Sequence, residues 1–325
     1  MKEITCADES KIPLIAIIGP TAVGKTVFSL ELAAKLSAEI ISVDSRQVYR
    51  YLDVGTDKVS QQIRREILHH IIDVADPDQI FSAADFASQA SDAVRRIKAR
   101  GKIPLMIGGT AFYYKALCGS LSENLPKDYD VRIQLESEIK EKGLSALHSE
   151  LQQIDPAASR KIHPNDPVRI MRALEIYRIT GRPSTYWYEN QKRIDSNYDV
   201  LYIGLTRSRA NLYRNIEDRV RSQFANGYAE EVEWLLAKGF SPKLPALQGF
   251  GYRELVRYVR GEITFEEALA GDVRSTKAFS RRQMTWFKHF TPAVWYDFDS
   301  KTPAEALEDV LPICLRHIGV EVADL

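Results

Sequence analysis

Hydrophobic and polar positions in the first third of the chain follow the pattern of strands separated by helices. Short apolar runs at residues 14–19, 38–45 and 102–109 predict buried strands, and the run at 69–74 is a further candidate. Between them, residues 24–37 and 82–101 have the spacing of helices, the second with a capping pattern at its start and a glycine at its end. Strands joined by helices of this length predict an α/β fold with a parallel sheet and right-handed crossovers.

The pattern changes in the middle of the chain, where strand signals vanish and polar helical patterns dominate. We therefore predict a mainly helical insertion domain at residues 121–198. The apolar run at 199–206 predicts a returning strand, followed by helical patterns and an edge strand at 294–299. Residues 1–120 and 199–325 together should form the core domain.

The segment GPTAVGKT directly follows the first predicted strand and opens the first predicted helix. It matches the phosphate-loop pattern GxxxxGK[ST], in which backbone N–H groups and a helix N-terminus face a phosphate. Lys25 would add a point charge, and the hydroxyl of Thr26 is the candidate ligand for Mg²⁺. We expect a P-loop NTPase-like core whose phosphate-binding residues are Gly19, Pro20, Thr21, Ala22, Val23, Gly24, Lys25 and Thr26.

A phosphate loop does not by itself predict ATP hydrolysis. Hydrolysing NTPases usually add a second acidic residue at a strand end and a residue that positions water. The strand at 102–109 ends in glycines, so the best acid is Asp44, at the end of the second strand and at the same sheet edge as the loop. From the pattern alone, Asp44 is a Mg²⁺ ligand, a general base, or a cap of the following turn.

The composition of the chain limits the kinds of binding partner and the cellular compartment that we expect for it. Lys plus Arg and Asp plus Glu are both 44, which excludes a protein basic all over but not a local basic face. The three cysteines, Cys6, Cys118 and Cys314, are far apart and form no CxxC pair, which argues against a disulfide framework or a zinc site. The polar N-terminus and the lack of any apolar stretch near ~20 residues predict a cytoplasmic protein without a membrane span.

Several arginine-rich helical patterns are candidates for contact with a phosphate backbone. Near the C-terminus, four basic residues fall on one side of a predicted helix and an aromatic face falls on another, which fits either a nucleic-acid contact or a solvated charged face over a packed one. Arg169 and Arg172 share a helical face, although Arg172 and Glu175 are also spaced to pair with each other. Arg209 lies nearest the end of the strand at 199–206 and is therefore expected to reach the phosphate site.

Six motifs in order resemble the bacterial type of the tRNA dimethylallyltransferase family, also called tRNA isopentenyltransferases. They are GPTAVGKT, DSRQVYR, GGTAFYYKAL, HPNDPVRIMRALEIYRITG, GFGYRE and RRQMTWFK, and they span about residues 13–290. The resemblance implies transfer of a dimethylallyl group from dimethylallyl diphosphate to N6 of the adenosine just 3′ of the anticodon in tRNA. The loop would then hold a diphosphate leaving group, and Mg²⁺, tRNA and dimethylallyl diphosphate would be the cofactor and partners of a chain expected to be a monomer.

The resemblance also assigns site residues. The catalytic residues would be Asp44, Thr21 and Arg209, with Arg209 binding the diphosphate. The residues that contact tRNA would be Asp44, Ser45, Arg46, Gln47, Thr110, Arg132, Val168, Arg169, Ile170, Met171, Arg172, Gln248, Gly249, Phe250, Gly251, Tyr252, Arg253, Arg281, Arg282, Gln283, Trp286 and Lys288.

Three other functions share some of these features. A P-loop small-molecule kinase would turn over ATP with a phosphoryl acceptor. An adenylate isopentenyltransferase would use free AMP, but a nucleotide-sized acceptor requires neither the insertion nor the basic C-terminal helix. A nucleotide-gated RNA-binding module would bind tRNA and leave it chemically unchanged.

Overall fold

The computed structural model describes residues 11–118, 125–190, 196–291 and 293–320. By its backbone contacts the chain divides into two compact units: unit 1 comprises residues 1–118 and 196–325, and unit 2 comprises residues 119–195. The sequence pattern had put the domain boundaries at residues 121 and 198; the first of these lies outside the described residues. Each unit has a hydrophobic core of its own.

Unit 1 is built on a six-stranded sheet in the order β3-β2-β4-β1-β5-β6, and all five strand pairs are parallel. This confirms the predicted α/β fold with a parallel sheet. β1 lies near the centre, with Leu14 to Ile18 fully buried, because helices cover both faces of such a sheet. The strands are β1 (Ile12–Ile18), β2 (Ala38–Ser42), β3 (His69–His70), β4 (Ile103–Ile107), β5 (Tyr198–Thr206) and β6 (Ala293–Asp297).

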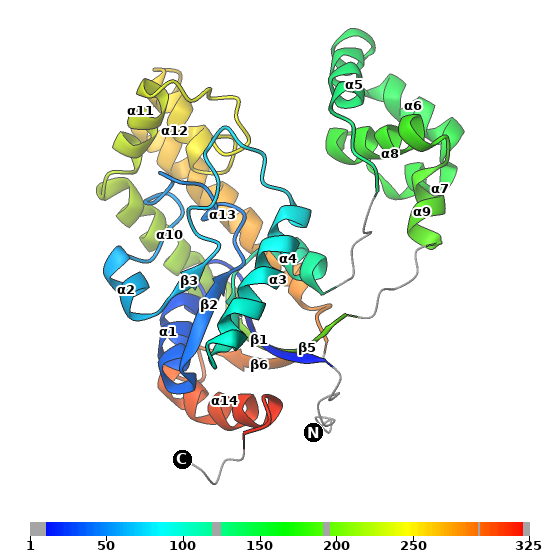
Figure 1. The fold of residues 1–325 in the computed structure, drawn as a ribbon. Helices are drawn as coiled ribbons and strands as arrows, with labels where there is room; N and C mark the ends of the chain where they lie inside the picture. Colours follow the sequence, from blue (N-terminus) through cyan, green and yellow to red (C-terminus); the bar gives the residue numbers. More distant parts are fainter. Residues whose placement is uncertain (1–10, 119–124, 191–195, 292, 321–325) are drawn as a thin grey trace. The chain divides into compact units, whose positions relative to one another are not determined.

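The helices of unit 1 form two layers on the sheet and a group beyond its carboxyl edge (Figure 1). Helices α1 and α14 pack together, and α3 packs with α4. The crossovers through α1 and α3 run in opposite directions along the sheet, so right-handed connections put these helices on opposite faces. The helices are α1 (Lys25–Leu36), α2 (Gln61–Glu66), α3 (Ala83–Ala99), α4 (Ala111–Leu117), α10 (Arg209–Ala225), α11 (Tyr228–Ala237), α12 (Tyr252–Val259), α13 (Phe265–Phe287) and α14 (Pro303–His317).

Local signals explain where several elements begin and end. The predicted capping box of α3 is present: Ser82 Oγ accepts the N–H of Asp85, and Gly101 follows the helix end at φ +69°. The apolar run at 69–74 yields only a two-residue strand, because Ile71 and Asp73 adopt left-handed φ values of 62° and 57° that end the pairing. The long helical pattern after β5 is two helices, broken at Gly227 with φ +94°.

Within residues 125–190, the described part of unit 2, every regular element is a helix. Its core gathers apolar residues from α5, α6, α7 and α8, among them Leu135, Leu151 and Leu174. α8 begins at Pro167 after Asp166, whose carboxylate accepts the N–H of Arg169, and Gly181 ends it at φ +68°. The helices are α5 (Tyr129–Lys142), α6 (Leu144–Ile154), α7 (Pro156–Lys161), α8 (Pro167–Thr180) and α9 (Ser184–Glu189).

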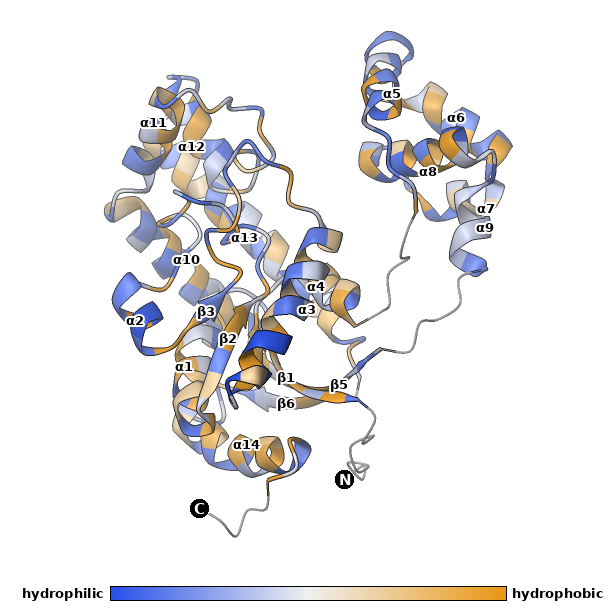
Figure 2. Cartoon of the chain, in the orientation of Figure 1, coloured by the Kyte–Doolittle hydropathy of each residue, from blue (hydrophilic) through white to orange (hydrophobic). Residues whose placement is uncertain are grey.

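The distribution of hydropathy agrees with this division into core and surface. Figure 2 shows apolar and hydrophilic residues alternating along most helices, whereas α2 is mostly hydrophilic. Among the described helices, none is both long and apolar enough to cross a membrane. Cys118 and Cys314 are free thiols, and Cys6 lies outside the described residues.

Unit 2 is stabilised by one buried carboxylate that holds two arginines. Glu175 on α8 is 1% exposed, and its oxygens accept Arg132 Nε at 2.8 Å, Arg172 Nη1 at 2.6 Å and the N–H of Asp128 at 3.1 Å. Burial alone would raise the pKa of Glu175, but the hydrogen bonds from Arg132 and Arg172 outweigh burial and lower it. The ion pair therefore stabilises unit 2 above the ordinary carboxyl pKa, and this stabilisation is lost as the pH falls through the lowered pKa.

We predict that Glu175→Gln destabilises unit 2 by about 3 kcal/mol at pH 7, because it leaves two guanidiniums without their buried counter-charge. Hydrogen exchange read by mass spectrometry should show peptides of residues 125–190 exchanging about 100-fold faster, with peptides of unit 1 unchanged. Glu136→Gln on the exposed side of α5 is the matched control. Equal protection in the two variants would contradict a stabilising role for Glu175.

Candidate functional site

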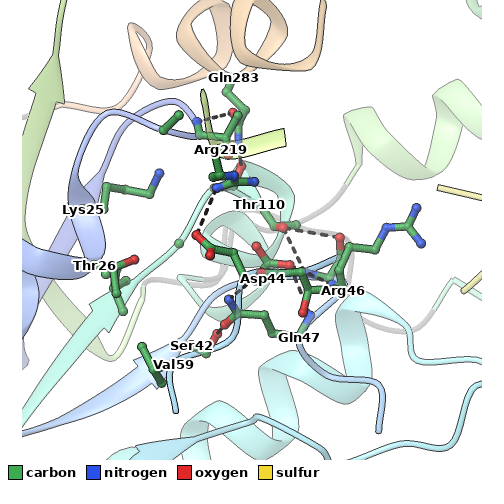
Figure 3. Close-up of a pocket in the computed structure, with 18 of the residues that line it drawn as sticks. Lys25, Thr26, Ser42, Asp44, Arg46, Gln47, Val59, Thr110, Arg219 and Gln283 are labelled. Atoms are coloured by element: carbon green, nitrogen blue, oxygen red, sulfur yellow. Dashed lines mark hydrogen bonds and ion pairs between the residues drawn. The ribbon is translucent and has the colours of Figure 1, made fainter. Parts of the chain in front are cut away.

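A cavity of about 410 Å³ lies at the carboxyl ends of β1, β2 and β4, where parallel sheets place their ligands. Figure 3 shows Lys25 and Thr26 on one side of it and Asp44 near its centre. All its lining residues belong to unit 1. Those that carry polar side chains are Thr21, Lys25, Thr26, Ser29, Ser42, Asp44, Ser45, Arg46, Gln47, Thr56, Asp57, His69, Thr110, Asn215, Arg219, Tyr252 and Gln283.

The phosphate loop has the conformation that its sequence predicts. It joins β1 to α1, and Gly24, the residue before α1, has φ +110°. Gly19 has φ +148°, and a Cβ there would lie 2.5 Å from the carbonyl oxygen of Leu205 on β5. Only glycine fits at such a position, and the curled backbone leaves the N-terminus of α1 facing the cavity.

Lys25 is drawn toward the carbonyls of its own loop. Its Nζ donates to Gly19 O at 3.0 Å and to Pro20 O at 2.7 Å. Burial of the ammonium, with a contribution from the charge of Arg219, lowers the pKa of Lys25 to about 7, although Asp44 acts in the opposite direction. The amine of Lys25 is therefore partly neutral near pH 7, and an anion beside it would raise its pKa and favour the charged form.

Arg219, and not Arg209, is the arginine whose charge acts on Lys25 in the cavity. Arg219, on α10, lines the cavity, and its Nη1 lies 3.6 Å from Oδ2 of Asp57. Arg209, at the start of the same helix, is exposed, and its Nε donates to the hydroxyl of Tyr213. The prediction that Arg209 reaches the phosphate site is therefore wrong. Two and a half to three turns of helix separate the two arginines, about 15 Å along the axis.

Asp44 ends β2 with its two carboxylate oxygens in different environments. Oδ1 accepts the N–H of Arg46 at 2.8 Å and of Gln47 at 3.3 Å, which holds the turn. Within the described part of the chain, no protein group bonds Oδ2. The side chain is thus both a turn cap and a carboxylate with one oxygen left for a ligand in the cavity.

The turn that follows Asp44 is tied to two other loops of unit 1. Thr110 Oγ1 accepts the N–H of Ser45 at 3.1 Å. Gln47 accepts Ser42 Oγ at 2.9 Å and donates to Thr56 O at 3.1 Å. The polar groups of Ser45, Gln47 and Thr110 therefore position the walls of the cavity.

Arg46 likewise forms an internal contact where the resemblance implied tRNA. Its Nη1 donates to Ala246 O at 2.6 Å and to Pro245 O at 3.3 Å. Gly249 accommodates this side chain, because a Cβ at residue 249 would lie 1.0 Å from Nη2 of Arg46. A larger residue at position 249 would therefore require the guanidinium of Arg46 to move.

Gln283 is buried inside unit 1 and does not face solvent. Its Oε1 accepts the N–H of Thr21 at 2.8 Å, and its Nε2 donates to Gly109 O at 3.0 Å. The amide joins the phosphate loop to the turn after β4 and also lines the cavity, so contact of this side chain with tRNA stays a prediction.

The rest of the predicted tRNA segment at residues 248–253 is mostly structural. Tyr252 is buried and donates to Glu231 at 2.7 Å, and Gly251 has φ +81°. Phe250 lines the cavity and pairs with Phe279 of α13 at a ring-centroid distance of 4.9 Å. On the surface, Gln248 and Arg253 are exposed.

The C-terminal part of α13 presents the other predicted tRNA residues to solvent. Arg281, Arg282, Trp286 and Lys288 are all exposed. Trp286 stacks with Lys115 of α4, whose Nζ lies 4.7 Å from the ring centroid. This end of the helix therefore carries positive charge and one exposed aromatic surface.

In unit 2, only part of the predicted tRNA segment is exposed. Val168 and Arg169 at the start of α8 are exposed, whereas Ile170 is fully buried in the core of the unit and Met171 packs against that core. Arg172 and Arg132 are held by Glu175, as described above. The pairing of Arg172 with Glu175, which the sequence left open, is confirmed, and the prediction of a tRNA contact through Ile170 is wrong.

Sequence reasoning missed the residue that holds one wall of the cavity. Glu231 on α11 accepts the N–H groups of Asp53, Val54 and Gly55 at 2.7, 2.7 and 3.2 Å, and also the hydroxyl of Tyr252. It thereby fixes the loop that carries Asp57 to Arg219. No sequence motif marks such an acceptor. For Arg219 the helical period offered a signal, because buried Ile216 and Val220 flank its position on α10.

The residues around the loop suit a Mg²⁺ ion that is held mainly by phosphate oxygens. No cluster of three acidic, histidine or cysteine ligands occurs among the residues that the structure describes. The hydroxyl of Thr26 lines the cavity next to the loop. Mg²⁺ commonly takes one or two protein ligands and fills its shell with substrate phosphates and water.

Comparison with known proteins gives one consistent family. The sequence model described as IPP transferase matches residues 47–290. The tRNA dimethylallyltransferase of Carboxydothermus hydrogenoformans is 42% identical over 308 residues, which cover 94% of this chain and 97% of that protein. That of Syntrophobacter fumaroxidans is 41% identical over 286 residues, covering 88% and 84%.

A solved structure of a relative has the same fold over nearly the whole chain. The full-length tRNA isopentenylpyrophosphate transferase of Bacillus halodurans matches with a TM-score of 0.70 and 36% identity, covering 95% of this chain and 97% of that one. The likeness therefore extends over both units.

We predict that binding of inorganic diphosphate at pH 8 takes up nearly one proton through Lys25. With a pKa of about 7 the amine is mostly neutral at pH 8, and an adjacent anion raises the pKa and restores the ammonium. At pH 6 the amine is already charged, so uptake should fall. Calorimetry in buffers of different ionisation enthalpy measures the proton count. Lys25→Arg, which stays charged, should lack the pH 8 uptake; equal counts in both proteins would contradict the prediction.

We predict that Arg219→Gln weakens diphosphate binding by about 10- to 100-fold, the worth of a charge-assisted hydrogen bond. Arg209→Gln should bind diphosphate as the wild type does, because its side chain lies outside the cavity. Direct calorimetric titration compares the two. A larger loss in Arg209→Gln than in Arg219→Gln would reverse the assignment.

Proposed function

The chain belongs to the IPP transferase family, and we propose that its cavity transfers a dimethylallyl group from dimethylallyl diphosphate to N6 of the adenosine 3′-adjacent to the anticodon in tRNA, releasing diphosphate. The observation that carries this proposal is the pairing, in one cavity, of a phosphate loop with a carboxylate that has one oxygen free. This pairing suits displacement of a diphosphate by an amine, which requires no activated water.

The leaving diphosphate binds in the phosphate loop. The N–H groups of the loop, the N-terminus of α1, Lys25 and Arg219 face the same part of the cavity. As the allylic C–O bond breaks, negative charge grows on the diphosphate, and fixed donors that strengthen with this charge lower the barrier. The hydroxyl of Thr21, also in the lining, is a further donor to the diphosphate. Mg²⁺ held by Thr26 and the diphosphate would supply additional charge neutralisation.

The acceptor amine is activated by Asp44. The lone pair of N6 is delocalised into the purine ring, so the amine is a weak nucleophile. Oδ2 of Asp44 takes the proton from N6 as the N6–C1 bond forms and the C1–O bond breaks, while Oδ1 keeps the turn in place. Products are the N6-prenylated adenosine, diphosphate and one proton, so atoms and charges balance.

The adenine has to leave the anticodon stack to reach a cavity of this size. Flipping a base costs a few kcal/mol, and contacts to the flanking RNA offset this cost. Exposed residues of α13 and of the start of α8 are available for such contacts: Arg281, Arg282, Trp286, Lys288, Val168 and Arg169. We further propose that the chain works as a monomer in the cytoplasm.

The direct test incubates the purified chain with dimethylallyl diphosphate, Mg²⁺ and unmodified tRNA, followed by mass spectrometry of the nucleosides. We expect one added C5H8 on the adenosine next to the anticodon. Parallel reactions with AMP as acceptor and with labelled ATP as donor test the adenylate isopentenyltransferase and kinase alternatives. Transfer to AMP alone, ATP turnover alone, or tRNA binding without modification would each overturn the proposal.

We predict that Asp44→Asn lowers the single-turnover transfer rate by about 10²- to 10⁴-fold, the usual worth of a general base. Asparagine keeps the Oδ1 acceptor that caps the turn. It replaces the basic Oδ2 oxygen by an amide nitrogen that cannot accept a proton. The affinity for tRNA should therefore change less than threefold, which fluorescence anisotropy measures. Transfer at the wild-type rate would remove the base assignment.

A further inference from the structure

A cluster of cations lies on the surface of unit 1 between α10 and α13, and of its members only Arg281 belongs to the tRNA-facing residues proposed above. We call it the Tyr213 cluster; it comprises Arg209 and Tyr213 of α10 and Lys277 and Arg281 of α13. The hydroxyl of Tyr213 accepts Arg209 Nε at 3.1 Å and Arg281 Nη1 at 2.7 Å. The guanidinium of Arg209 and the ammonium of Lys277 lie 5.4 and 5.0 Å from the centroid of its ring.

The charges of this cluster are only partly balanced. Lys277 is paired with Glu217 of α10. Among the residues that the structure describes, no carboxylate forms an ion pair with either Arg209 or Arg281. The two guanidiniums instead converge on one neutral oxygen, and their hydrogen bonds lower the pKa of Tyr213. Two like charges close together repel each other. An anion bound between them is attracted to both, so the electrostatic energy of the group becomes favourable.

The cluster and the cavity use different sides of α10. Arg209, Tyr213 and Glu217 are spaced four residues apart and therefore share one face, which meets Lys277 and Arg281, four apart on α13. Asn215 and Arg219, which line the cavity, lie on another side of the helix. The cluster is thus outside the cavity and on another side of α10 from the residues that line it.

We propose that the Tyr213 cluster binds one backbone phosphate of the tRNA substrate. This rests on the proposed function. Arg281 lies in a segment that the family resemblance assigns to tRNA, and the new element is the contribution of Arg209 and Tyr213 from α10. Two guanidiniums held by one phenol oxygen keep their other N–H donors for a phosphate, and the shared hydroxyl fixes their orientation before binding.

A polyanion suits this site better than a small free anion. Each exposed cation is screened by salt beyond about 8–10 Å, so a single phosphate in solution gains little there. An RNA that is already bound through its flipped base brings its backbone to the surface at high effective concentration. Release of counterions then makes the affinity depend on salt.

The test measures the affinity of unmodified tRNA by fluorescence anisotropy as a function of KCl concentration. The variants are Arg209→Gln, Arg281→Gln, the double variant and Tyr213→Phe. The matched control is Arg214→Gln, which removes the same charge from an exposed neighbour on α10. Circular dichroism and inorganic diphosphate binding confirm that each variant is folded with an intact cavity.

We expect Arg209→Gln and Arg281→Gln each to weaken tRNA binding about 5- to 10-fold relative to Arg214→Gln. Both arginines bind the same phosphate, so the double variant should lose one phosphate contact and not two. The slope of log Kd against log salt should therefore fall by no more than about 0.7–0.9. Tyr213→Phe keeps every charge, so it should weaken binding about 3-fold while the slope stays unchanged.

Two results would overturn the proposal. One is an Arg209→Gln variant with the affinity and slope of Arg214→Gln; the other is an Arg209→Gln variant that loses affinity for inorganic diphosphate and not for tRNA. If the wild-type chain prenylates tRNA and either result is obtained, only the proposed phosphate contact of the Tyr213 cluster is rejected. Failure of the wild type to modify tRNA rejects the proposed function instead.

Discussion

The site depends on one buried amide. Gln283 accepts the N–H of Thr21 with one end of its side chain and donates to Gly109 O with the other. Both polar atoms of the amide are satisfied, so its burial costs little, and removal of either partner would leave a buried polar group unpaired. Through this contact α13 sets the position of the phosphate loop relative to the end of β4. Thr110 follows Gly109 and accepts the N–H of Ser45, so it links the end of β4 to the turn that follows Asp44.

Charge in the cavity is arranged around this frame. Lys25 and Arg219 are two cations that line the cavity, and each has an internal partner: loop carbonyls for Lys25 and Asp57 for Arg219. These contacts hold the cations in a geometry that an incoming diphosphate can take over with small movements. Asp44 is preorganised in the same way, because the hydrogen bond to Oδ1 fixes the direction in which Oδ2 points. Preorganised donors and acceptors of this kind avoid reorganisation during the reaction.

Local signals in the sequence predicted the backbone around the cavity. The loop at residues 19–26 and the acid at the end of β2 follow from strand, turn and helix patterns within a few residues of one another. The error at Arg209 came from choosing the arginine nearest a strand end. The direction of α10 instead brings Arg219 to the cavity, about three turns further along, and only the packing of the helix decides this.

Long-range contacts could not be predicted, for the same physical reason. Gln283 and Glu231 act on backbone groups more than 170 residues away in sequence, and any glutamine or glutamate on a helix has the same local pattern. Arg132 and Arg172 were assigned to tRNA although one buried carboxylate, Glu175, holds both. In these cases the motif was recognisable, but the partner of each side chain was set by the tertiary fold.

The most direct test of this account is a crystal structure of the chain with a non-reactive thio analogue of dimethylallyl diphosphate and an anticodon stem-loop. The account predicts the diphosphate on the N–H groups of residues 19–26, between Lys25 and Arg219. It also predicts N6 of the flipped adenine at about 2.6–3.2 Å from Oδ2 of Asp44. A diphosphate bound away from the loop, or an adenine amine turned away from Asp44, would contradict it.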